Sequence, residues 1–461
     1  MSWADGGARP APRIAFARWT ESLARAGWPA PGVPAPGGPV PGVGAAERVP
    51  VGEALGRVTA APVAARWPSP RSDCAAMDGI AVRAADLTAA PLARAADGIA
   101  DVIGGAGGAT VRLAAGAFEW IDTGDPMPAG ADTVVMREWL LPQADGSVLV
   151  TAAAGQRDSG LRAPHATRGR NVRTAGEDFA AGELLVPAGR RLRPGDLAAA
   201  AAGGHATVTV VRNPVVAVIP TGDEIRPVGT ALRRGAITDT NSVMVAARCR
   251  QLGAVPLVSA VVPDDPDALA AELRLAAAEA DLVLVIAGSS RGRGDHAAAV
   301  LAQVGGVAVA GVAVRPGHPA LLGHAKRPDA SHAHAGPGQA GHRSGVAPVI
   351  GLPGYPLATA VIFELFATPM LEALTGQAPA AARVRARLDR DWSSPADVED
   401  WVLVTLGAAG PDGLPAATPA RRGAGSISQL ARADAWWPVP AGQGDLPAGA
   451  AIEVLPIQLT S

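Results

Sequence analysis

Lysine is almost absent from this chain of 461 residues, and cysteine and the aromatic residues are scarce. The one lysine, Lys326, follows an alanine, which excludes the Gly-Lys-Ser/Thr signature of a Walker A phosphate loop. The two cysteines, Cys74 and Cys249, give no disulfide framework in a chain this long and fit a reducing compartment. Since aromatic residues make up only 3% of the chain, Ala, Val and Leu must fill its cores.

Strong charge of either sign and a targeting signal are also missing. The formal net charge is −2, which implies no general polyanion-binding surface. The N-terminus has no basic-then-apolar signal pattern. A membrane span needs about 20 consecutive apolar residues, and we expect none here. The sequence therefore predicts a cytoplasmic protein that binds neither nucleic acid nor membranes.

Hydrophobic periodicity predicts a three-layer α/β domain between residues 212 and 377, where strand and helix patterns alternate. The expected strands are Val215–Ile219, Val255–Val262 and Leu282–Ile286, followed by a return to the sheet at Val349–Leu352. The expected helices are Asn241–Leu252, Pro266–Ala280, Ala297–Gln303 and Thr359–Leu374. This alternation is typical of a parallel sheet with helices on both faces.

The rest of the chain predicts further units around this α/β domain, in an elongated multidomain arrangement. An amphipathic helix is expected at Ile14–Ala26, a Pro/Gly-rich linker at 28–44 and a helix-like segment at Val51–Ala65. Short segments with frequent turns predict β-rich structure before and after the α/β domain, the latter barrel-like. A low-complexity, loop-like insert at Gly323–Ala347 carries four irregularly spaced histidines, from which no functional metal site is expected. The predicted boundaries are 1–65 (N-terminal helix, linker and first part of a linker domain), 66–169 (small β-rich domain), 170–211 (second part of the linker domain), 212–377 (α/β domain) and 378–461 (C-terminal β domain).

The segment Asp281–Asp295, DLVLVIAGSSRGRGD, is the most informative part of the chain. A buried strand runs into a loop with Gly288, Ser289 and Ser290, and a helix pattern follows. Backbone N–H groups at such a turn, together with the helix dipole, suit a phosphate or another oxyanion. Asp295 beside an anion site suggests Mg²⁺ between them, although a plain βα turn with Asp295 as a helix cap explains the same residues.

Other polar blocks also follow predicted strands. In open α/β sheets ligands bind at the carboxyl ends of strands, so these blocks should gather at one edge of the sheet. The blocks contribute Thr221, Glu224, Asp239, Asn241, Arg315, Pro353 and Pro356. Together with the carboxylates of Asp78 and Asp264 and the guanidinium of Arg173, they suit divalent cations that bridge an oxyanion. Ordinary turn chemistry accounts for any one block alone.

Taken in order, the blocks resemble the MoeA-type molybdopterin molybdenumtransferases, from about Val51 to the C-terminus. The matching segments are AAMDGIAVR, DTGDPMPAGADTVVMRE, GRNVRTAGEDFAAGELLVPAGRRL, VIPTGDEI, TDTN, RPGHP, GLPGYP, GSISQLARADAW and LPAGAAIEVLPI. The resemblance implies a MogA-like molybdopterin-binding α/β domain. It also implies a transferase that uses molybdate and adenylylated molybdopterin, releases AMP and requires Mg²⁺.

The resemblance also implies roles for particular residues. Positions that the family uses catalytically match Asp78, Thr123, Glu224, Asp264 and Asp295, and Glu224 and Asp295 are expected to bind the metal or the pterin nucleotide. Binding positions match Thr221, Asp239, Asn241, Gly288, Ser289, Ser290, Arg315, Pro353 and Pro356. A homodimer is implied, with each site shared between the small β-rich domain of one subunit and the α/β domain of the other. A molybdopterin adenylyltransferase is the implied upstream partner.

The chain departs from the family pattern at several positions, which leaves alternative functions open. AGSSRGRG stands where GGVSxG is usual, His318 and Gly311 replace basic residues, and Tyr355 replaces an asparagine. Arginine and histidine differ from lysine in donor geometry and charge. The alternatives are a homologue that uses tungstate, a molybdopterin adenylyltransferase, and a non-enzymatic pterin-binding carrier or scaffold.

Overall fold

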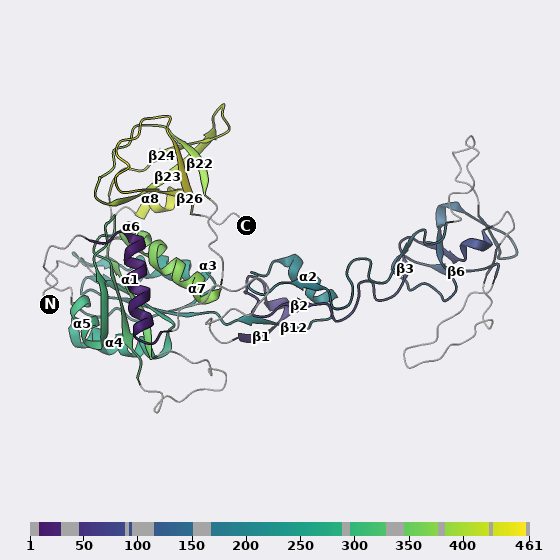
Figure 1. The fold of residues 1–461 in the computed structure, drawn as a ribbon, viewed down its shortest axis with the longest axis horizontal. Coiled ribbons are helices and arrows are strands. Elements are labelled where there is room, and N and C mark those ends of the chain that lie inside the picture. Colours follow the sequence, from purple (N-terminus) through teal and green to yellow (C-terminus); the bar gives the residue numbers. More distant parts are fainter. Residues whose placement is uncertain are drawn as a thin grey trace.

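The computed structural model describes residues 9–28, 46–87, 92–94, 115–150, 167–287, 296–328, 345–376, 383–423 and 427–457. The molecule is elongated (Figure 1). The α/β domain and the C-terminal barrel lie at one end and the small β-rich domain at the other, with the linker domain between them. The predicted combination of α/β and β-rich units in an elongated chain is confirmed.

A six-stranded sheet forms the centre of the α/β domain. Its strands, in spatial order, are β16 (Val255–Val258), β13 (Val215–Pro220), β17 (Leu282–Ala287), β21 (Val346–Pro353), β20 (Leu321–Lys326) and β18 (Gly305–Ala310). The first four are parallel, whereas β20 is antiparallel to β21 and β18 is antiparallel to β20. The predicted parallel sheet is therefore right for the centre and wrong for this edge.

Neither β18 nor β20 is predicted from the sequence, and the glycines that begin β18 explain why this strand is hard to recognise. Gly305 and Gly306 resemble a turn in sequence, yet they begin β18 because the backbone of β20 passes close to them. A Cβ on Gly305 would lie 1.9 Å from the carbonyl oxygen of His324. The expected insert is accordingly shorter than predicted, since His324 belongs to β20. His332, His334 and His342 lie outside the described residues.

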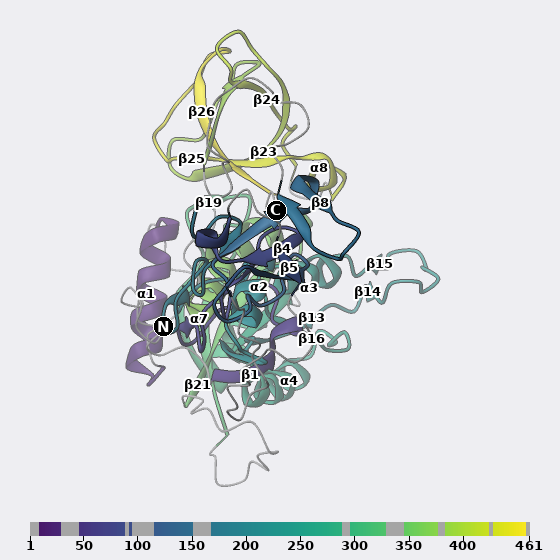
Figure 2. The same cartoon turned by 90° about the vertical axis from the view of Figure 1, so that its right-hand side faces the viewer.

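Helices cover both faces of the sheet, as a three-layer domain requires. Alternate residues of β17 face opposite sides: Leu282 and Leu284 join one buried cluster, and Val283 and Val285 join the other. One face is covered by α1 (Pro12–Arg25), α3 (Asn241–Gln251), α6 (Pro356–Ile362) and α7 (Thr368–Thr375). The other face is covered by α4 (Pro266–Glu279) and α5 (Ala297–Val304). Figure 2 shows α1 and α4 on opposite sides of the domain.

The amphipathic helix predicted near the N-terminus is confirmed as α1, and its packing partner is the α/β domain rather than the linker domain. Trp19 and Leu23 are fully buried against the sheet. The Trp19 indole Nε1 donates a hydrogen bond to the Gly323 carbonyl oxygen at 2.7 Å. The first helix is thereby fixed across the antiparallel edge of the sheet.

The long helix after β21 is continuous through a π-helical turn at Phe363–Ala367. By length and composition, the helix Pro356–Thr375 is apolar enough to cross a membrane: an 18-residue part of it has a mean hydropathy of 1.6, and 56% of that part is buried inside the protein. Phe363, Phe366 and Leu371 pack against the sheet. Its apolar character matches its position as a core helix.

Two distant segments of sequence form the linker domain. β1 (Ala46–Pro50) pairs with β12 (Thr207–Val211), and β2 (Val63–Ala64) pairs with β11 (Leu184–Val186). The short helix α2 (Pro194–Ala202) completes the unit. The helix predicted at Val51–Ala65 is wrong: only a 3₁₀ turn at Val51–Glu53 forms, and Gly56 and Pro62, which follow, favour turns and β-bridges.

The small β-rich domain is built around a four-stranded sheet. Its strands, in spatial order, are β5 (Ala93–Arg94), β6 (Ala117–Ile121), β4 (Gly79–Val82) and β7 (Thr133–Met136). Smaller pairs are β8 (Leu140–Pro142) with β9 (Val148–Val150), and β3 (Cys74–Ala75) with β10 (Val172–Arg173). The β3–β10 pair connects the segment that enters this domain to the segment that leaves it towards the linker domain.

The C-terminal domain is a closed five-stranded barrel, which Figure 2 shows nearly end-on. Its strands are β22 (Val384–Leu388), β23 (Glu399–Ala409), β24 (Pro415–Pro419), β25 (Ala435–Val439) and β26 (Ala451–Pro456). Pairing of β23 with both β24 and β25 closes it. The short strand β19 (Val314–Arg315) of the α/β domain pairs with β23 in parallel. Backbone hydrogen bonds therefore connect the α/β domain to the barrel.

Candidate functional site

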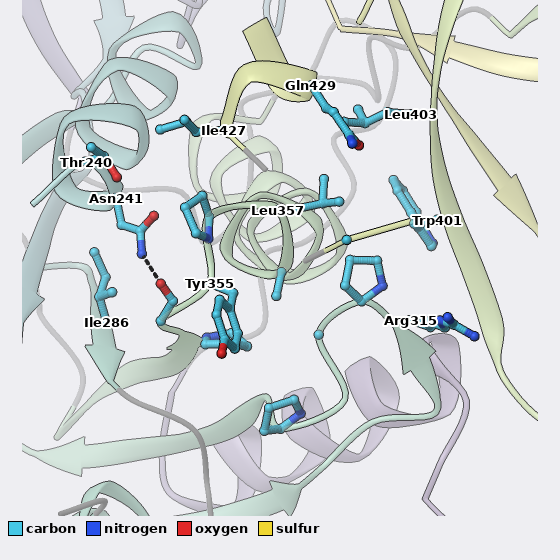
Figure 3. A pocket seen from close by; sticks show the side chains of 18 of the residues that line it. Thr240, Asn241, Ile286, Arg315, Tyr355, Leu357, Trp401, Leu403, Ile427 and Gln429 are labelled. Carbon is cyan, nitrogen blue, oxygen red and sulfur yellow. Dashed lines mark hydrogen bonds between the residues drawn. The ribbon is translucent and has the colours of Figure 1, made fainter. Parts of the chain in front are cut away.

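A pocket of about 1170 Å³ lies between the carboxyl edge of the α/β sheet and the barrel. Seven of the residues predicted from sequence line it: Thr221, Glu224, Asp239, Asn241, Arg315, Pro353 and Pro356. They come from segments separated by up to 135 positions, and the strand order brings them to one edge as expected. Figure 3 shows the pocket with the side chains of both walls.

The carboxyl ends of β13 and β17 line the α/β side of the pocket. Both the backbone N–H and the hydroxyl of Thr221 donate to the Ile286 carbonyl oxygen, at 2.9 and 3.0 Å. These bonds hold the turn after β13 against the end of β17. The loop that continues from β17, with the predicted Gly288, Ser289, Ser290 and Asp295, lies outside the described residues.

The start of α3 forms one side of this wall. The Asp239 carboxylate accepts a hydrogen bond from the Ser242 backbone N–H at 3.0 Å and so supports the first turn of the helix. Asn241 is only 8% exposed, and its Nδ2 donates to the Gly354 carbonyl oxygen at 2.7 Å. That bond ties α3 to the GLPGYP turn, where Tyr355 is 61% exposed at the pocket.

Glu224 is an acidic residue of the α/β wall. Its carboxylate lies over Gly222, where a Cβ would come within 2.9 Å of Oε2, so glycine gives the side chain its room. Its side chain has no hydrogen bond or ion pair with the part of the chain that the structure describes. Carboxylate oxygens are the donors that Mg²⁺ prefers, and Glu224 and Asp239 both line the pocket. Within the described ranges no three His, Cys, Asp or Glu side chains converge on one point.

Positive charge enters the pocket from both walls. Arg315 of β19 lines the α/β side and Arg421 lines the barrel side, and neither guanidinium is neutralised by a described residue. Two cationic groups without an acid partner in the described part of the chain favour an anionic ligand between them.

The N-terminal segment lies close to this cationic region. At Gly311, where the resemblance leads one to expect a basic residue, a Cβ would lie 3.3 Å from Nε of Arg9 and 3.4 Å from the His318 carbonyl oxygen. The Ala313 N–H donates to the Pro10 carbonyl oxygen at 2.9 Å and holds the two segments together. A guanidinium from the N-terminal segment therefore occupies the space beside Gly311.

The barrel wall contains pocket residues that sequence reasoning missed. They include Trp392, Asp400, Trp401, Arg421, Arg422, Ile427 and Gln429. Asp400 is 4% exposed and pairs with Arg422 at 3.1 Å, and the Arg422 guanidinium lies 4.6 Å from the centre of the Trp392 ring. The block GSISQL, which contains Gln429, was recognised as a family match, yet nothing in the residues themselves signalled that this part of the barrel faces the sheet edge.

Asp78 and Thr123 lie in the small β-rich domain, far from the pocket of the same chain (Figure 1). One Asp78 carboxylate oxygen accepts two hydrogen bonds, from the Thr123 hydroxyl and from the Thr123 backbone N–H, each 2.7 Å long. The hydroxyl bond, then the backbone bond, lowers the pKa of Asp78 below its usual value, and Arg137 contributes in the same direction. The structure thus joins these two predicted residues to each other and separates them from the other seven.

Asp264 and Arg173 are the remaining predicted residues within the described ranges. The Asp264 backbone N–H contacts the Asp223 carboxylate at 3.3 Å, beside the pocket rather than among its lining residues. Arg173 pairs with Glu177 at 3.0 Å on the β10 side of the small domain. The convergence expected of these two residues with the sheet edge is not seen within one chain.

Three family models match successive parts of the chain. The MoeA N-terminal region (domain I and II) matches residues 24–204, the probable molybdopterin binding domain matches residues 217–373, and the MoeA C-terminal region (domain IV) matches residues 385–457.

Curated relatives and solved structures agree with these models. A molybdopterin molybdenumtransferase of Bacillus subtilis is 31% identical over 421 residues, which cover 90% of each chain. One of Nostoc is 32% identical over 348 residues, covering 74% of this chain and 73% of the relative. A crystal structure of a molybdopterin biosynthesis MoeA protein from Pyrococcus horikosii superposes with a TM-score of 0.73 at 27% identity, over 98% of this chain and 100% of that one.

Proposed function

The chain belongs to the MoeA family and is a molybdopterin molybdenumtransferase of molybdenum cofactor biosynthesis, and from this premise we propose the finer chemistry of its reaction. The substrates are molybdate and adenylylated molybdopterin, and the products are molybdenum bound to the pterin dithiolene and free AMP. One water molecule adds across the P–O–P anhydride between pterin phosphate and AMP, and this is the bond that breaks. As the two dithiolene sulfurs bind molybdenum, one molybdate oxygen leaves as water with the two thiol protons. Mg²⁺, held by Glu224 and Asp295, would supply positive charge for this cleavage.

One observation carries the proposal: separate acidic and basic side chains converge on one pocket at the carboxyl edge of the sheet. Arg315 and Arg421 offer charge to anionic groups, and molybdate, pterin phosphate and AMP phosphate are all anions. Glu224, whose carboxylate has no partner among the described residues, offers a ligand for Mg²⁺, with Asp295 as its proposed partner. The pocket size suits a ligand larger than a single oxyanion.

Bound Mg²⁺ would neutralise charge on phosphate oxygens. The chain's own groups have complementary tasks. Arg315 and Arg421 orient anionic groups between the two walls, and the Thr221 and Asn241 hydrogen bonds keep the sheet edge rigid while the ligand enters. Mg²⁺ fits this pocket because the carboxylates that line it are hard oxygen donors. Among the described lining residues there is no thiol, and His318 is the one imidazole.

The shared site of a homodimer is the second part of the proposal. Asp78 and Thr123 are far from the pocket within one subunit, so they can contribute only if the small domain of a partner subunit reaches it. An adenylyltransferase that makes adenylylated molybdopterin is the proposed upstream partner, because the substrate needs such an enzyme to form.

Measurement of AMP release from adenylylated molybdopterin tests the reaction. The wild-type protein is assayed with Mg²⁺ and molybdate, with tungstate, with neither, and with ATP and unadenylylated molybdopterin instead. We expect release that depends on the oxyanion and falls at least 100-fold in Glu224→Gln and in Asp295→Asn. Glu279→Gln, an exposed acid at the end of α4, is the matched control and should stay at wild-type rate.

Each other result assigns a different function. Preference for tungstate identifies a tungsten-using homologue. Pyrophosphate release from ATP without an oxyanion identifies an adenylyltransferase. Tight pterin binding without AMP release under any condition identifies a carrier or scaffold and overturns the proposal.

A further inference from the structure

Buried polar atoms without hydrogen-bond partners are concentrated at the pocket. Among the described residues six such side-chain atoms occur, and three belong to pocket-lining residues: Oδ1 of Asn241, Nε1 of Trp392 and Oε1 of Gln429. Folded proteins rarely leave buried polar atoms unpaired, because each has lost its water without a replacement. Their gathering around one cavity points to a ligand that supplies the missing partners.

The two amide oxygens belong to opposite walls of the cavity. Nδ2 of Asn241 is held by the Gly354 carbonyl oxygen at 2.7 Å, which fixes the amide and leaves its oxygen on the cavity side (Figure 3). Gln429 lies on α8 (Ile427–Arg432) of the barrel, and its amide points into the same cavity from the other side (Figure 3).

Whether each of these groups accepts or donates hydrogen bonds determines which ligand chemistry fits the pocket. An amide oxygen accepts hydrogen bonds, so a phosphate or molybdate oxygen is a poor partner for either one. The same pocket is also lined by apolar side chains, which include Ile286, Leu357, Trp401, Leu403 and Ile427. This combination suits a flat heteroaromatic ring that carries N–H groups at its edges, and the Trp392 indole N–H can donate to a ring nitrogen or carbonyl.

We propose that Gln429 and Asn241 bind an amino-bearing heteroaromatic ring of the substrate, so that the C-terminal barrel takes part in substrate recognition. The inference rests on the proposed function, in which the substrate carries two such rings, a pterin and an adenine. Both rings present N–H donors. The anionic part of the same ligand would contact Arg315 and Arg421, which line the same pocket.

Calorimetric titration of the full-length protein with molybdopterin and, separately, with AMP distinguishes the two rings. Gln429→Leu removes the acceptor, and we expect it to weaken binding of one of these ligands about tenfold or more. Gln429→Glu keeps an acceptor oxygen and should lose less than Gln429→Leu. Gln443→Leu, an exposed glutamine in another turn of the barrel, is the matched control and should bind like wild type.

Thermal stability supplies a second readout. Since Oε1 of Gln429 has no hydrogen-bond partner among the described residues, Gln429→Leu should unfold at the wild-type temperature or above it, while the rise in Tm on adding ligand shrinks. A ligand-free Gln429→Leu protein that unfolds well below wild type shows a structural role for Gln429 and overturns the inference. Wild-type affinity of Gln429→Leu for both ligands overturns it as well.

The outcome for the wild-type protein separates this inference from the proposed function. Oxyanion-dependent AMP release with unchanged KM in Gln429→Leu sinks the ring-binding role alone. Absence of both AMP release and ligand binding in the wild-type protein sinks the proposed function together with it. A raised KM at nearly unchanged kcat is the expected kinetic result, because ring recognition is remote from the anhydride that breaks.

Discussion

Asp78 and Thr123 show how a local contact sets the charge of a candidate site residue. Both hydrogen bonds to the Asp78 carboxylate come from Thr123, and they favour its ionised form. The pKa of Asp78 is therefore lower in the folded protein than its usual 3.8. Stability from this contact is present above that usual pKa and is lost as the pH falls through the lowered pKa.

Thr123→Val removes the hydroxyl donor and should raise the pKa of Asp78 towards its usual value. Carbon-13 NMR titration of the carboxyl groups measures the shift. Asp145 of the same domain has its pKa lowered by equivalent bonds from Ser147, so it is an internal control that should not move. An Asp78 titration curve that is identical in the variant and the wild type contradicts this account.

Single residues could be predicted from sequence where a strand end fixes their position. Thr221 follows β13 and Pro353 ends β21, and parallel strands must end at one edge, so both reach the pocket. Gln429 could not be found this way, because its place depends on how the barrel docks against the α/β domain, which precedes it in the sequence. Asp264 was expected both as one of the carboxylates suited to a divalent cation and from the family resemblance, and it lies beside the pocket lining.

At the scale of elements, α1 secures the antiparallel edge of the α/β sheet. Trp19 is fully buried and donates to the Gly323 carbonyl oxygen. Trp19→Ala should destabilise the α/β domain by about 3–5 kcal/mol through the lost contacts and the cavity left behind. Trp19→Phe should cost less, since it keeps most of the apolar contact and loses the hydrogen bond.

Urea unfolding followed together with hydrogen exchange of the β18 and β20 amides measures this effect. The expected sign is an earlier midpoint and faster exchange in those strands. Trp120→Ala in the small domain is the control, because Trp120 is 38% exposed and should have little effect. Equal losses in the two variants would show that the burial of Trp19 is not what holds the edge.

Elements with a strong period were predictable, and those shaped by a neighbour were not. α4 begins and ends within one residue of its predicted range, since its apolar residues recur at helical spacing. β18 was missed because its opening glycines are needed for close approach to β20, a contact that no local pattern encodes. The Val51–Ala65 segment has helix-like spacing, yet it pairs with residues 120 or more positions later in the sequence.

At the scale of the whole molecule, the elongated shape decides how the site can be completed. The pocket and the Asp78–Thr123 pair lie at opposite ends of one chain (Figure 1). Two antiparallel chains related by a twofold axis can place each end against the other, which gives two equivalent shared sites. A compact monomer would offer no such exchange.

Subunit mixing tests this arrangement directly. Asp78→Ala damages only the small-domain contribution, and Glu224→Gln damages only the pocket, so each homodimer should be inactive in AMP release. In a heterodimer with shared sites, one site combines both defects and the other combines two intact halves. Random mixing makes half of the dimers heterodimers, so about a quarter of the wild-type activity should return.

The control for subunit mixing is a single chain that carries both substitutions, mixed with either single variant. With shared sites, a heterodimer of the double variant and a single variant has no intact site, so the mixture stays inactive. If each site lay within one subunit, no combination of the two single variants would contain an intact site either, and mixing them would restore nothing. Recovery in the mixture of single variants alone is therefore the result that only a site shared between subunits can give.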